Sequence, residues 1–470
     1  MAEALAGGTA GVQRVRELVA VALDAVGAAS AERGGPAPGG GPAAVAAALS
    51  LPLAGTGVLP EHGTGASDAL AELTGVLTAG SVDPAHPWCA AHLHCPPLAV
   101  AAAADLVASV LNPSMDSWDQ APAASQLEGE LVAALARLCY PDAATPDAVI
   151  TSGGTESNLV GLLLARETRG AVQPVCGRTA HHSVARAAWL LGLPAPLVVD
   201  CPGQRMSTDA LATVLGAVTG PAAVVATAGT TDAGTIDPLV DIAELTGRAG
   251  AWLHVDAAYG GAALFSHDLA PLLAGLGAAD SVAVDLHKFG WQPIAAGVLA
   301  TREAVALTAL DVRAEYLNAD DDTEAGLPDL LGRSVRTSRR PDAFKIAVTL
   351  RALGRTGIAA LVEHCCHVAT EVADAIRAHP DLRVWGEPEL STVLFRPTAA
   401  DGPAGDELVA TVRRRLLESG TAVLGRANVD GRVWLKLTLL HPHATAADYL
   451  GLLDLVASAV REAGVDLVVR

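Results

Sequence analysis

From residue 147 onward, short runs of β-branched and other apolar residues alternate with stretches whose apolar residues recur at helical spacing. The runs read AVIT at 148, PLVV at 196, AAVVAT at 222, WLHVDAA at 252 and SVAVD at 281. Strands that alternate with helices in this way form mostly parallel sheets covered by helices on both faces. The alternation therefore predicts a large α/β domain.

The segments on either side of this domain follow other patterns. Residues 12–31 have helical spacing, and residues 34–41 are glycine or proline at every position except Ala37, which indicates a helical arm followed by a flexible joint. Three more helices are expected at 67–79, 98–111 and 124–138. Beyond Lys345 a long helical pattern leads to the runs LRVWG at 382, STVLFRP at 391 and RVWLKLTLL at 432, typical of a small α+β domain.

These patterns predict three parts. We expect a helical arm and Gly/Pro-rich joint at 1–83, a large domain at 84–340 and a small C-terminal α+β domain at 341–470. Within the large domain, residues 314–332 lack periodicity and are rich in acidic residues, glycine and proline. Such a segment is expected to be a mobile loop.

Charge and cysteine content exclude several kinds of partner. The chain carries 31 Lys and Arg against 51 Asp and Glu, a net charge of −20, so it lacks the basic footprint of nucleic-acid binding. Its seven cysteines are scattered without a CxxC pair, which argues against a disulfide framework or a metal site. No basic stretch precedes an apolar one at the start, and the apolar run 98–110 carries Asp105. We therefore expect neither an export signal nor a membrane span, and a cytoplasmic protein.

The first segment with recognisable chemistry is TSGGTESN at 151–158, between an expected strand and an expected helix. Glycines let backbone N–H groups approach an anion, the helix N-terminus favours a phosphate, and Thr155 adds a hydroxyl donor. For an isolated Gly-Gly-Thr, a capped helix after a glycine turn is the more common explanation.

Three further segments each have a plain alternative when taken alone. Asp256 ends an apolar strand, where α/β sheets place ligands, although it would also serve as a helix N-cap. Lys288 follows another strand beside apolar Phe289 and Trp291, where desolvation favours the neutral amine that forms a Schiff base, although most lysines are surface charges. His181 enters a helix, where a histidine is more often structural.

Together, in this order, the four segments supply the parts that hold pyridoxal 5′-phosphate: a phosphate anchor, a ring stack, a pyridinium partner and a Schiff-base lysine. The chain resembles the group II pyridoxal-phosphate-dependent amino-acid decarboxylases from about Pro84 to Pro442. It is most similar to the L-2,4-diaminobutyrate decarboxylase branch, through HLHCPPL at 92, NPSMDSWDQAPAAS at 112, TSGGTESN at 151, AGTTDAGTIDPL at 228, HVDAAYGG at 254, DLHKFGWQPIAAG at 285 and GRSVRTSRRPDAFK at 332.

The resemblance implies a type I PLP-dependent transferase fold, like that of aspartate aminotransferase, and a role for each matching residue. Lys288 should form the Schiff base, Asp256 should hold the pyridine nitrogen protonated, and His181 should stack on the ring. The phosphate and the rest of the cofactor should be held by Gly153, Gly154, Thr155, Thr230, Ala258 and His287. The resemblance also implies a homodimer with the active site at the interface.

Tyr316 matches the family tyrosine that delivers a proton to Cα from a mobile loop, with a loop-anchoring aromatic as its alternative. Relatives that consume oxygen and release an aldehyde carry Phe there, so this chain should produce a simple amine and CO2. Trp88 and His94 should line the substrate pocket. The pocket is also marked by two departures from the family, Cys89-Ala90 and His441-Pro442 in place of Asn-Pro.

Substrate choice depends on Asp116, which stands where relatives acting on aromatic amino acids or glutamate have Phe. We expect Asp116 of one subunit to pair with the side-chain ammonium of a substrate bound in the other, since a carboxylate suits a cation; an interface or helix-terminal acid is the alternative. The expected substrate is a diamino acid such as diaminobutyrate. Ornithine, lysine, aromatic and acidic amino acids stay open, as do a transaminase, a carbon–sulfur lyase and a cofactor-binding pseudoenzyme.

Overall fold

The structure is a computed structural model that describes residues 4–51, 53–54, 57–311 and 320–468. Contacts divide the chain into two compact units. The large unit comprises residues 97–367 and 388–391, and the small unit comprises residues 1–96, 368–387 and 392–470. Within the described ranges, no helix is long and apolar enough to cross a membrane.

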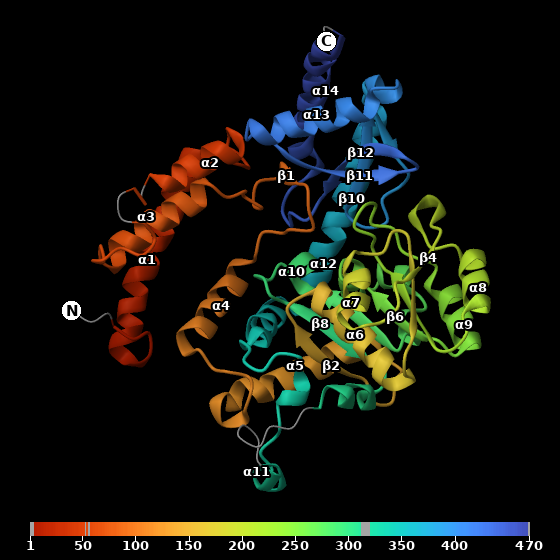
Figure 1. Cartoon of the computed structure of the whole chain (residues 1–470). Helices are drawn as coiled ribbons and strands as arrows, with labels where there is room; N and C mark the ends of the chain where they lie inside the picture. Colours follow the sequence, from red (N-terminus) through yellow and green to blue (C-terminus); the bar gives the residue numbers. More distant parts are fainter. Residues whose placement is uncertain (1–3, 52, 55–56, 312–319, 469–470) are drawn as a thin grey trace. The chain divides into compact units, whose positions relative to one another are not determined.

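The large unit is built on a seven-stranded sheet in the order β2-β8-β7-β6-β5-β3-β4 (Figure 1). β8 runs antiparallel to both neighbours and every other adjacent pair is parallel. The predicted mostly parallel α/β sheet is therefore confirmed. The strands are β2 (Asp147–Thr151), β3 (Gln173–Gly177), β4 (Leu197–Val199), β5 (Ala222–Thr227), β6 (Trp252–Asp256), β7 (Ser281–Asp285) and β8 (Gly297–Thr301).

Helices cover both faces of this sheet. Successive residues of a strand point to opposite faces, so neighbouring apolar residues of β8 pack against different helices. Val298 shares a small cavity with Leu135 of α5, whereas Leu299 packs in a core cluster with Leu162 of α6. The helices are α4 (Ala99–Leu111), α5 (Pro122–Cys139), α6 (Gly154–Arg169), α7 (Ser183–Leu190), α8 (Thr208–Ala217), α9 (Leu239–Ala249), α10 (Leu286–Phe289), α11 (Asp320–Glu324) and the first part of α12 (Asp342–Ala378).

The small unit is built on a five-stranded sheet in the order β1-β11-β12-β10-β9, antiparallel except for the β1–β11 pair. Its strands are β1 (Cys89–Ala90), β9 (Leu382–Trp385), β10 (Thr392–Pro397), β11 (Val423–Val429) and β12 (Arg432–Thr438). Its apolar core, with Phe395, Leu435 and Val456, is closed by helices. These are the end of α12, α13 (Gly405–Glu418) and α14 (Ala446–Val468), and the chain start adds α1 (Gly8–Arg33), α2 (Gly41–Ser50) and α3 (Ala66–Ala79).

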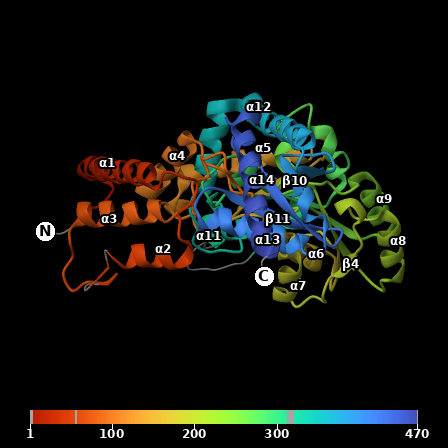
Figure 2. The ribbon, with the colours of Figure 1, turned by 90° about the horizontal axis from the view of Figure 1, so that it is seen from above.

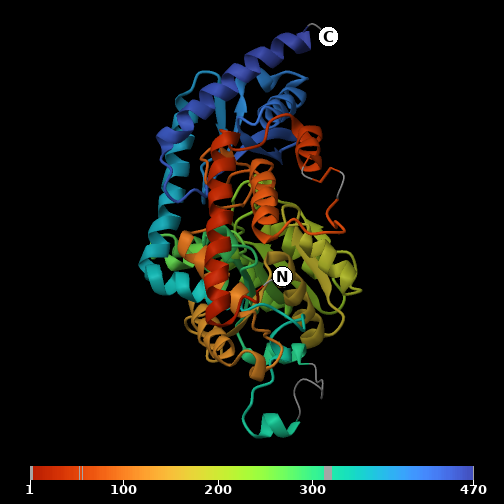
Figure 3. The same ribbon diagram turned by 90° about the vertical axis from the view of Figure 1, so that its left-hand side faces the viewer.

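The N-terminal segment is tied to the small unit. α1 and α3 lie side by side (Figures 2 and 3), and Arg33 at the end of α1 donates to the Thr78 carbonyl at 2.7 Å and pairs with Asp83 at 2.9 Å. Residues 34–41, expected to form a flexible joint, are held in place: Ala37 is buried, and the Gly40 N–H donates to the Glu418 carbonyl at 2.7 Å.

The unit boundaries fall elsewhere than the expected 83/84 and 340/341. β1 pairs with β11, which keeps residues up to 96 with the small unit, and α12 passes from one unit to the other between His367 and Val368. Part of the expected loop 314–332 is helical, as α11.

Candidate active site

The carboxyl ends of parallel strands meet at one edge of the large sheet, the edge where such sheets bind ligands. β2, β6 and β7 end at Thr151, Asp256 and Asp285 and lead into the segments that the sequence singled out. Alternation along β6 and β7 places Asp256 and Asp285 on the same sheet face as His254 and Ser281.

Directly after β2, the backbone of Gly153 and Gly154 lies against the side chains of His287 and Ala258. We call these two glycines the glycine cradle. Gly153 has φ 154°, and a Cβ there would lie 2.8 Å from Cε1 of His287. A Cβ on Gly154 would lie 2.9 Å from Cβ of Ala258, so side chains at both positions would fill the space. α6 begins at Gly154, and its first turn has backbone N–H groups without intrahelical acceptors. Thr155 lies exposed on this turn. The arrangement suits a phosphate.

Lys288 lies on α10, directly after β7. Its Nζ is 3.1 Å from Oδ2 of Asp285, and Nε2 of His287 is 3.4 Å from the same oxygen. Asp285 is buried, and its Oδ1 has no hydrogen-bond partner among the described residues. No role was predicted for Asp285 from the sequence, although it lies three residues before Lys288.

Asp256 is a buried acceptor held by two N–H donors. Its Oδ2 accepts from Nδ2 of Asn158 at 2.7 Å, and its Oδ1 accepts from the Ala258 backbone at 3.1 Å. Each oxygen keeps a lone pair for a further donor such as a pyridinium. Asn158 belongs to the motif TSGGTESN, from which no role was predicted for it.

His181 is half-buried, and its Nδ1 lies 2.8 Å from Oγ of Ser183. Burial lowers the pKa of His181, and the Asp256 carboxylate partly offsets this. Lys288 and Asp285 also act on it electrostatically, so the structure brings these four side chains together. Thr230 is buried, and its Oγ1 lies 2.8 Å from Oγ1 of Thr235.

The expected substrate residues fall in both units. Asp116, in the large unit, is buried; its Oδ1 accepts from Gln120 at 2.9 Å and its Oδ2 from Ser338 at 3.3 Å. Trp88 and His94 belong to the small unit, where Nε1 of Trp88 donates to the Asp448 carbonyl at 2.8 Å. Tyr316 lies outside the described residues.

The departure at His441 has a structural explanation within the small unit. Nε2 of His441 lies 3.0 Å from the carbonyl of Ala85, which accepts the ring N–H. Burial is the main cause that lowers the pKa of His441, so near neutral pH the ring is an uncharged donor. This bond holds the segment that leads to Trp88.

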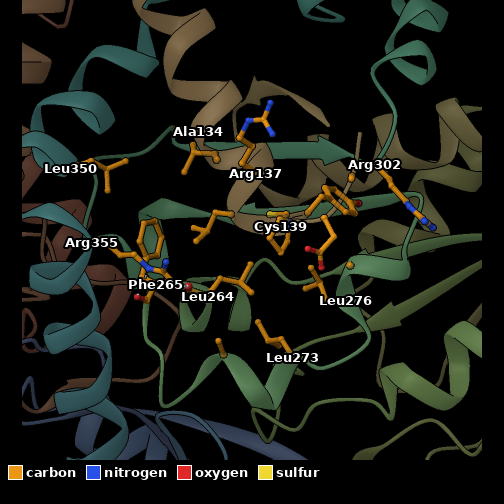
Figure 4. Close-up of a pocket in the computed structure, with 18 residues that line it drawn as sticks. Ala134, Arg137, Cys139, Leu264, Phe265, Leu273, Leu276, Arg302, Leu350 and Arg355 are labelled. Carbon is orange, nitrogen blue, oxygen red and sulfur yellow. Dashed lines mark hydrogen bonds between the residues drawn. The ribbon is translucent and has the colours of Figure 1, made fainter. Parts of the chain in front are cut away.

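A cavity of about 760 Å³ lies elsewhere in the large unit (Figure 4). Arg137, Phe265, Arg302 and Arg355 surround it, and none of the expected site residues lines it. It has no group of acid, base and amine like that at the sheet edge. Among the described residues, no cluster of three or more His, Cys, Asp or Glu is placed to hold a metal ion.

The residues at the sheet edge fit pyridoxal phosphate. The glycine cradle would be filled by any Cβ, Asp256 has acceptor capacity to spare, and Lys288 supplies an amine on the same edge. The donor set therefore matches a group with a phosphate, a basic ring nitrogen and an aldehyde.

Comparison with known proteins agrees with this geometry. Residues 59–398 match the pyridoxal-dependent decarboxylase conserved domain. The chain therefore belongs to the pyridoxal-dependent decarboxylase family, whose cofactor is pyridoxal phosphate.

Two relatives and one solved structure narrow the likeness. An L-2,4-diaminobutyrate decarboxylase of Rhizobium meliloti (strain 1021) is 42% identical over 419 residues, 86% of this chain and 84% of the relative. An enzyme of the same name from Acinetobacter baumannii is 34% identical, with 85% of each chain covered. The glutamate decarboxylase domain of a Vibrio parahaemolyticus diaminobutyrate-pyruvate transaminase and L-2,4-diaminobutyrate decarboxylase superposes with a TM-score of 0.85 at 30% identity, covering 97% of this chain and 98% of that one.

Proposed function

We propose that this chain decarboxylates L-2,4-diaminobutyrate with pyridoxal phosphate as cofactor, releasing CO2 and 1,3-diaminopropane. The observation that carries the proposal is the 42% identity, across 86% of the chain, to an enzyme of that name. The grouping of Lys288, Asp256 and His181 at one sheet edge supports the same reaction class. Ornithine and lysine differ from diaminobutyrate by methylenes, each worth about 1–3 kcal/mol of selectivity in a pocket.

Each residue at the sheet edge has a proposed task. Pyridoxal phosphate, when bound, supplies an aldehyde that condenses with amines and a ring that withdraws electrons from a breaking bond. Lys288 provides the amine that tethers it, Asp256 keeps a proton on the ring nitrogen, and His181 packs against the ring face. The phosphate and ring edges are held by Gly153, Gly154, Thr155, Thr230, Ala258 and His287.

Two further tasks belong to residues on other segments. We assign Tyr316 the delivery of a proton to the substrate Cα after CO2 leaves, which gives an amine. Trp88 and His94 are assigned to the wall of the substrate pocket. The protein is proposed to act in the cytoplasm as a homodimer.

Asp116 is proposed to recognise the side-chain ammonium of the substrate. Its carboxylate is buried and bonded to two neutral donors, Gln120 and Ser338, so its charge is available to a cationic ligand. An ammonium gains a charge-assisted hydrogen bond there, whereas an aromatic or acidic side chain gains nothing.

Substitution of Asp116 separates the substrate from the reaction. Asp116→Asn should raise KM for diaminobutyrate about tenfold or more, the loss expected for one hydrogen bond to a charged group. Asp142→Asn is the control, because Asp142 is an exposed carboxylate outside the hydrogen-bonded group around Asp116. Equal KM changes for diaminobutyrate and for a neutral amino acid would remove Asp116 from substrate recognition.

Product analysis tests the reaction class. Incubation with diaminobutyrate and pyridoxal phosphate should release CO2 and 1,3-diaminopropane in equal amounts. A keto acid product would instead indicate a transaminase. The absence of both the amine and the keto acid would contradict the proposed activity.

A further inference from the structure

A continuous set of hydrogen bonds runs through the interior of the large unit and joins Asp256 to His181. We call it the Asn158 network, and its members are Trp252, Ser281, His254, Asn158, Asp256, Ser183 and His181. Asn158 is its branch point: Nδ2 reaches Oδ2 of Asp256 at 2.7 Å and Oγ of Ser183 at 2.8 Å, and Oδ1 lies 2.8 Å from Nε2 of His254. All members except His181 are buried.

The carboxylate of Asp256 sets the direction of the first bonds. An ionised carboxylate only accepts, so the amide nitrogen of Asn158 must face it and the amide oxygen must face His254. His254 therefore donates from Nε2. Only one orientation of the Asn158 amide therefore satisfies both Asp256 and His254.

The hydrogen bonds on the His254 side of Asn158 also have their donors directed toward Asp256. Burial lowers its pKa to about 4, so the ring is neutral near pH 7 and carries one N–H, which is on Nε2. Its Nδ1 then accepts from Oγ of Ser281 at 2.8 Å, and the Ser281 oxygen accepts the indole N–H of Trp252 at 3.2 Å. Every donor on this branch meets one acceptor.

The other branch ends at His181. Ser183 accepts the second N–H of Asn158, so its own proton is free to point to Nδ1 of His181 at 2.8 Å. The backbone N–H of Ser183 also approaches Nδ1, at 3.4 Å. With two donors aimed at it, Nδ1 is an acceptor, and the single proton of the neutral ring lies on Nε2.

Helix α6 is shaped to hold this branch point. Asn158 and Gly161 are three residues apart and share one helix face. A Cβ on Gly161 would lie 2.6 Å from both Cε1 and Nδ1 of His254, so only glycine leaves space for the ring. The helix and strand β6 therefore fit together around the amide of Asn158.

We propose that Asn158 is a positioning residue that acts on both Asp256 and His181, and that it fixes His181 as the tautomer with its proton on Nε2. In this arrangement His181 presents an N–H donor away from the network. The proposal rests on the proposed function only in giving Asp256 and His181 their cofactor roles. Neither Asn158 nor the tautomer follows from the match to the family.

Nitrogen NMR of the holoenzyme with 15N-labelled histidine tests the tautomer directly, because protonated and unprotonated ring nitrogens have distinct shifts. The His181 signals are assigned by their loss in His181→Asn. The unsubstituted protein should show Nε2 protonated and Nδ1 unprotonated at neutral pH. A proton on Nδ1 of His181 would overturn the proposal without any variant of the network.

Two variants test the branch point. Asn158→Asp keeps the shape but replaces the amide donor with a second carboxyl group against Asp256, at a contact that is 2.7 Å in the unsubstituted protein. Because two carboxylates this close repel each other or share a proton, the variant should weaken cofactor binding about tenfold or more and let His181 populate both tautomers. Ser183→Ala removes the donor to His181 but leaves the bond from Asn158 to Asp256 in place. It should mix the His181 tautomers and weaken cofactor binding, measured by fluorescence titration, by less than Asn158→Asp does. If Asn158→Asp does not fold, Ser183→Ala still tests the branch.

The readouts separate this proposal from the proposed function, because neither needs substrate. Unchanged His181 shifts in Ser183→Ala, or unchanged cofactor affinity in a folded Asn158→Asp, would overturn the network proposal while leaving decarboxylation intact. If the protein shows the predicted nitrogen shifts but decarboxylates no amino acid, the network proposal is supported and the proposed function is contradicted.

Discussion

His254 makes the stability of the fold depend on pH. Burial lowers its pKa to about 4, whereas an unfolded histidine titrates near 6.5. Between these values the unfolded chain binds a proton that the folded chain does not, so stability is fully present above about pH 6.5 and is lost as the pH falls toward 4. The full loss is roughly 3 kcal/mol.

Urea unfolding of the unsubstituted protein and of His254→Gln measures this effect. Between about pH 7.5 and about pH 5 the unsubstituted protein should lose about 2 kcal/mol more than the variant, whose amide does not titrate. The same pH dependence in both would show that His254 does not carry it.

Individual site residues differ in how far the sequence could reveal them. Lys288, Asp256 and Gly153 could be named before any fold was known because their motifs, taken together, resemble those of a known family, although each motif alone has a plainer explanation. Asn158 and Asp285 lie in the same motifs, but their roles depend on partners. Asn158 is hydrogen-bonded to Asp256 and His254, about a hundred residues away, and no local pattern predicts such a pairing.

At the scale of elements, α5 is fastened to the segment before α12 by a buried ion pair. Arg339 donates to Glu128 through both terminal nitrogens, at 2.7 and 2.6 Å, and both side chains are buried. Glu128→Gln leaves the Arg339 charge without its counter-ion and should cost about 3–5 kcal/mol of unfolding free energy.

Glu130→Gln is the control for this substitution, because Glu130 is on the same helix but its contact with Gln126 is exposed. Its cost should stay within about 0.5 kcal/mol in denaturant unfolding. Equal losses for the two variants would mean that the buried pair does not stabilise the fold.

The strands show which elements the sequence could predict. β2, β5, β6 and β7 were expected because each is a continuous apolar run. β3 was missed because QPVCG contains a proline and ends in glycine, and sheet pairing on both sides with β4 and β5 overrides that weak local preference. β8 was missed because it begins at a glycine directly after the segment 290–296 and follows β7 without a full crossover helix, as its antiparallel pairing allows.

At the scale of the whole molecule, the proposed homodimer places Asp116 of one subunit in the site of the other. A mixture of Lys288→Ala subunits and Asp116→Asn subunits should then recover activity when it is assayed at a low concentration of diaminobutyrate. A heterodimer would contain one site with both native residues, so random exchange should restore about a quarter of the native sites.

The control is each variant mixed with itself, which should give no gain. Mass spectrometry would confirm that heterodimers have formed. If they show no recovered activity, Asp116 and Lys288 of one site belong to the same subunit.

A competition between amino acids for decarboxylation tests the proposed substrate directly. The purified protein with pyridoxal phosphate would meet equimolar diaminobutyrate, ornithine, lysine, glutamate, tyrosine and tryptophan, and mass spectrometry would identify the amines formed. We expect more 1,3-diaminopropane than any other amine, with smaller amounts of the products of ornithine and lysine. Preferential decarboxylation of glutamate, tyrosine or tryptophan would contradict the role of Asp116, and no amine at all would contradict the activity.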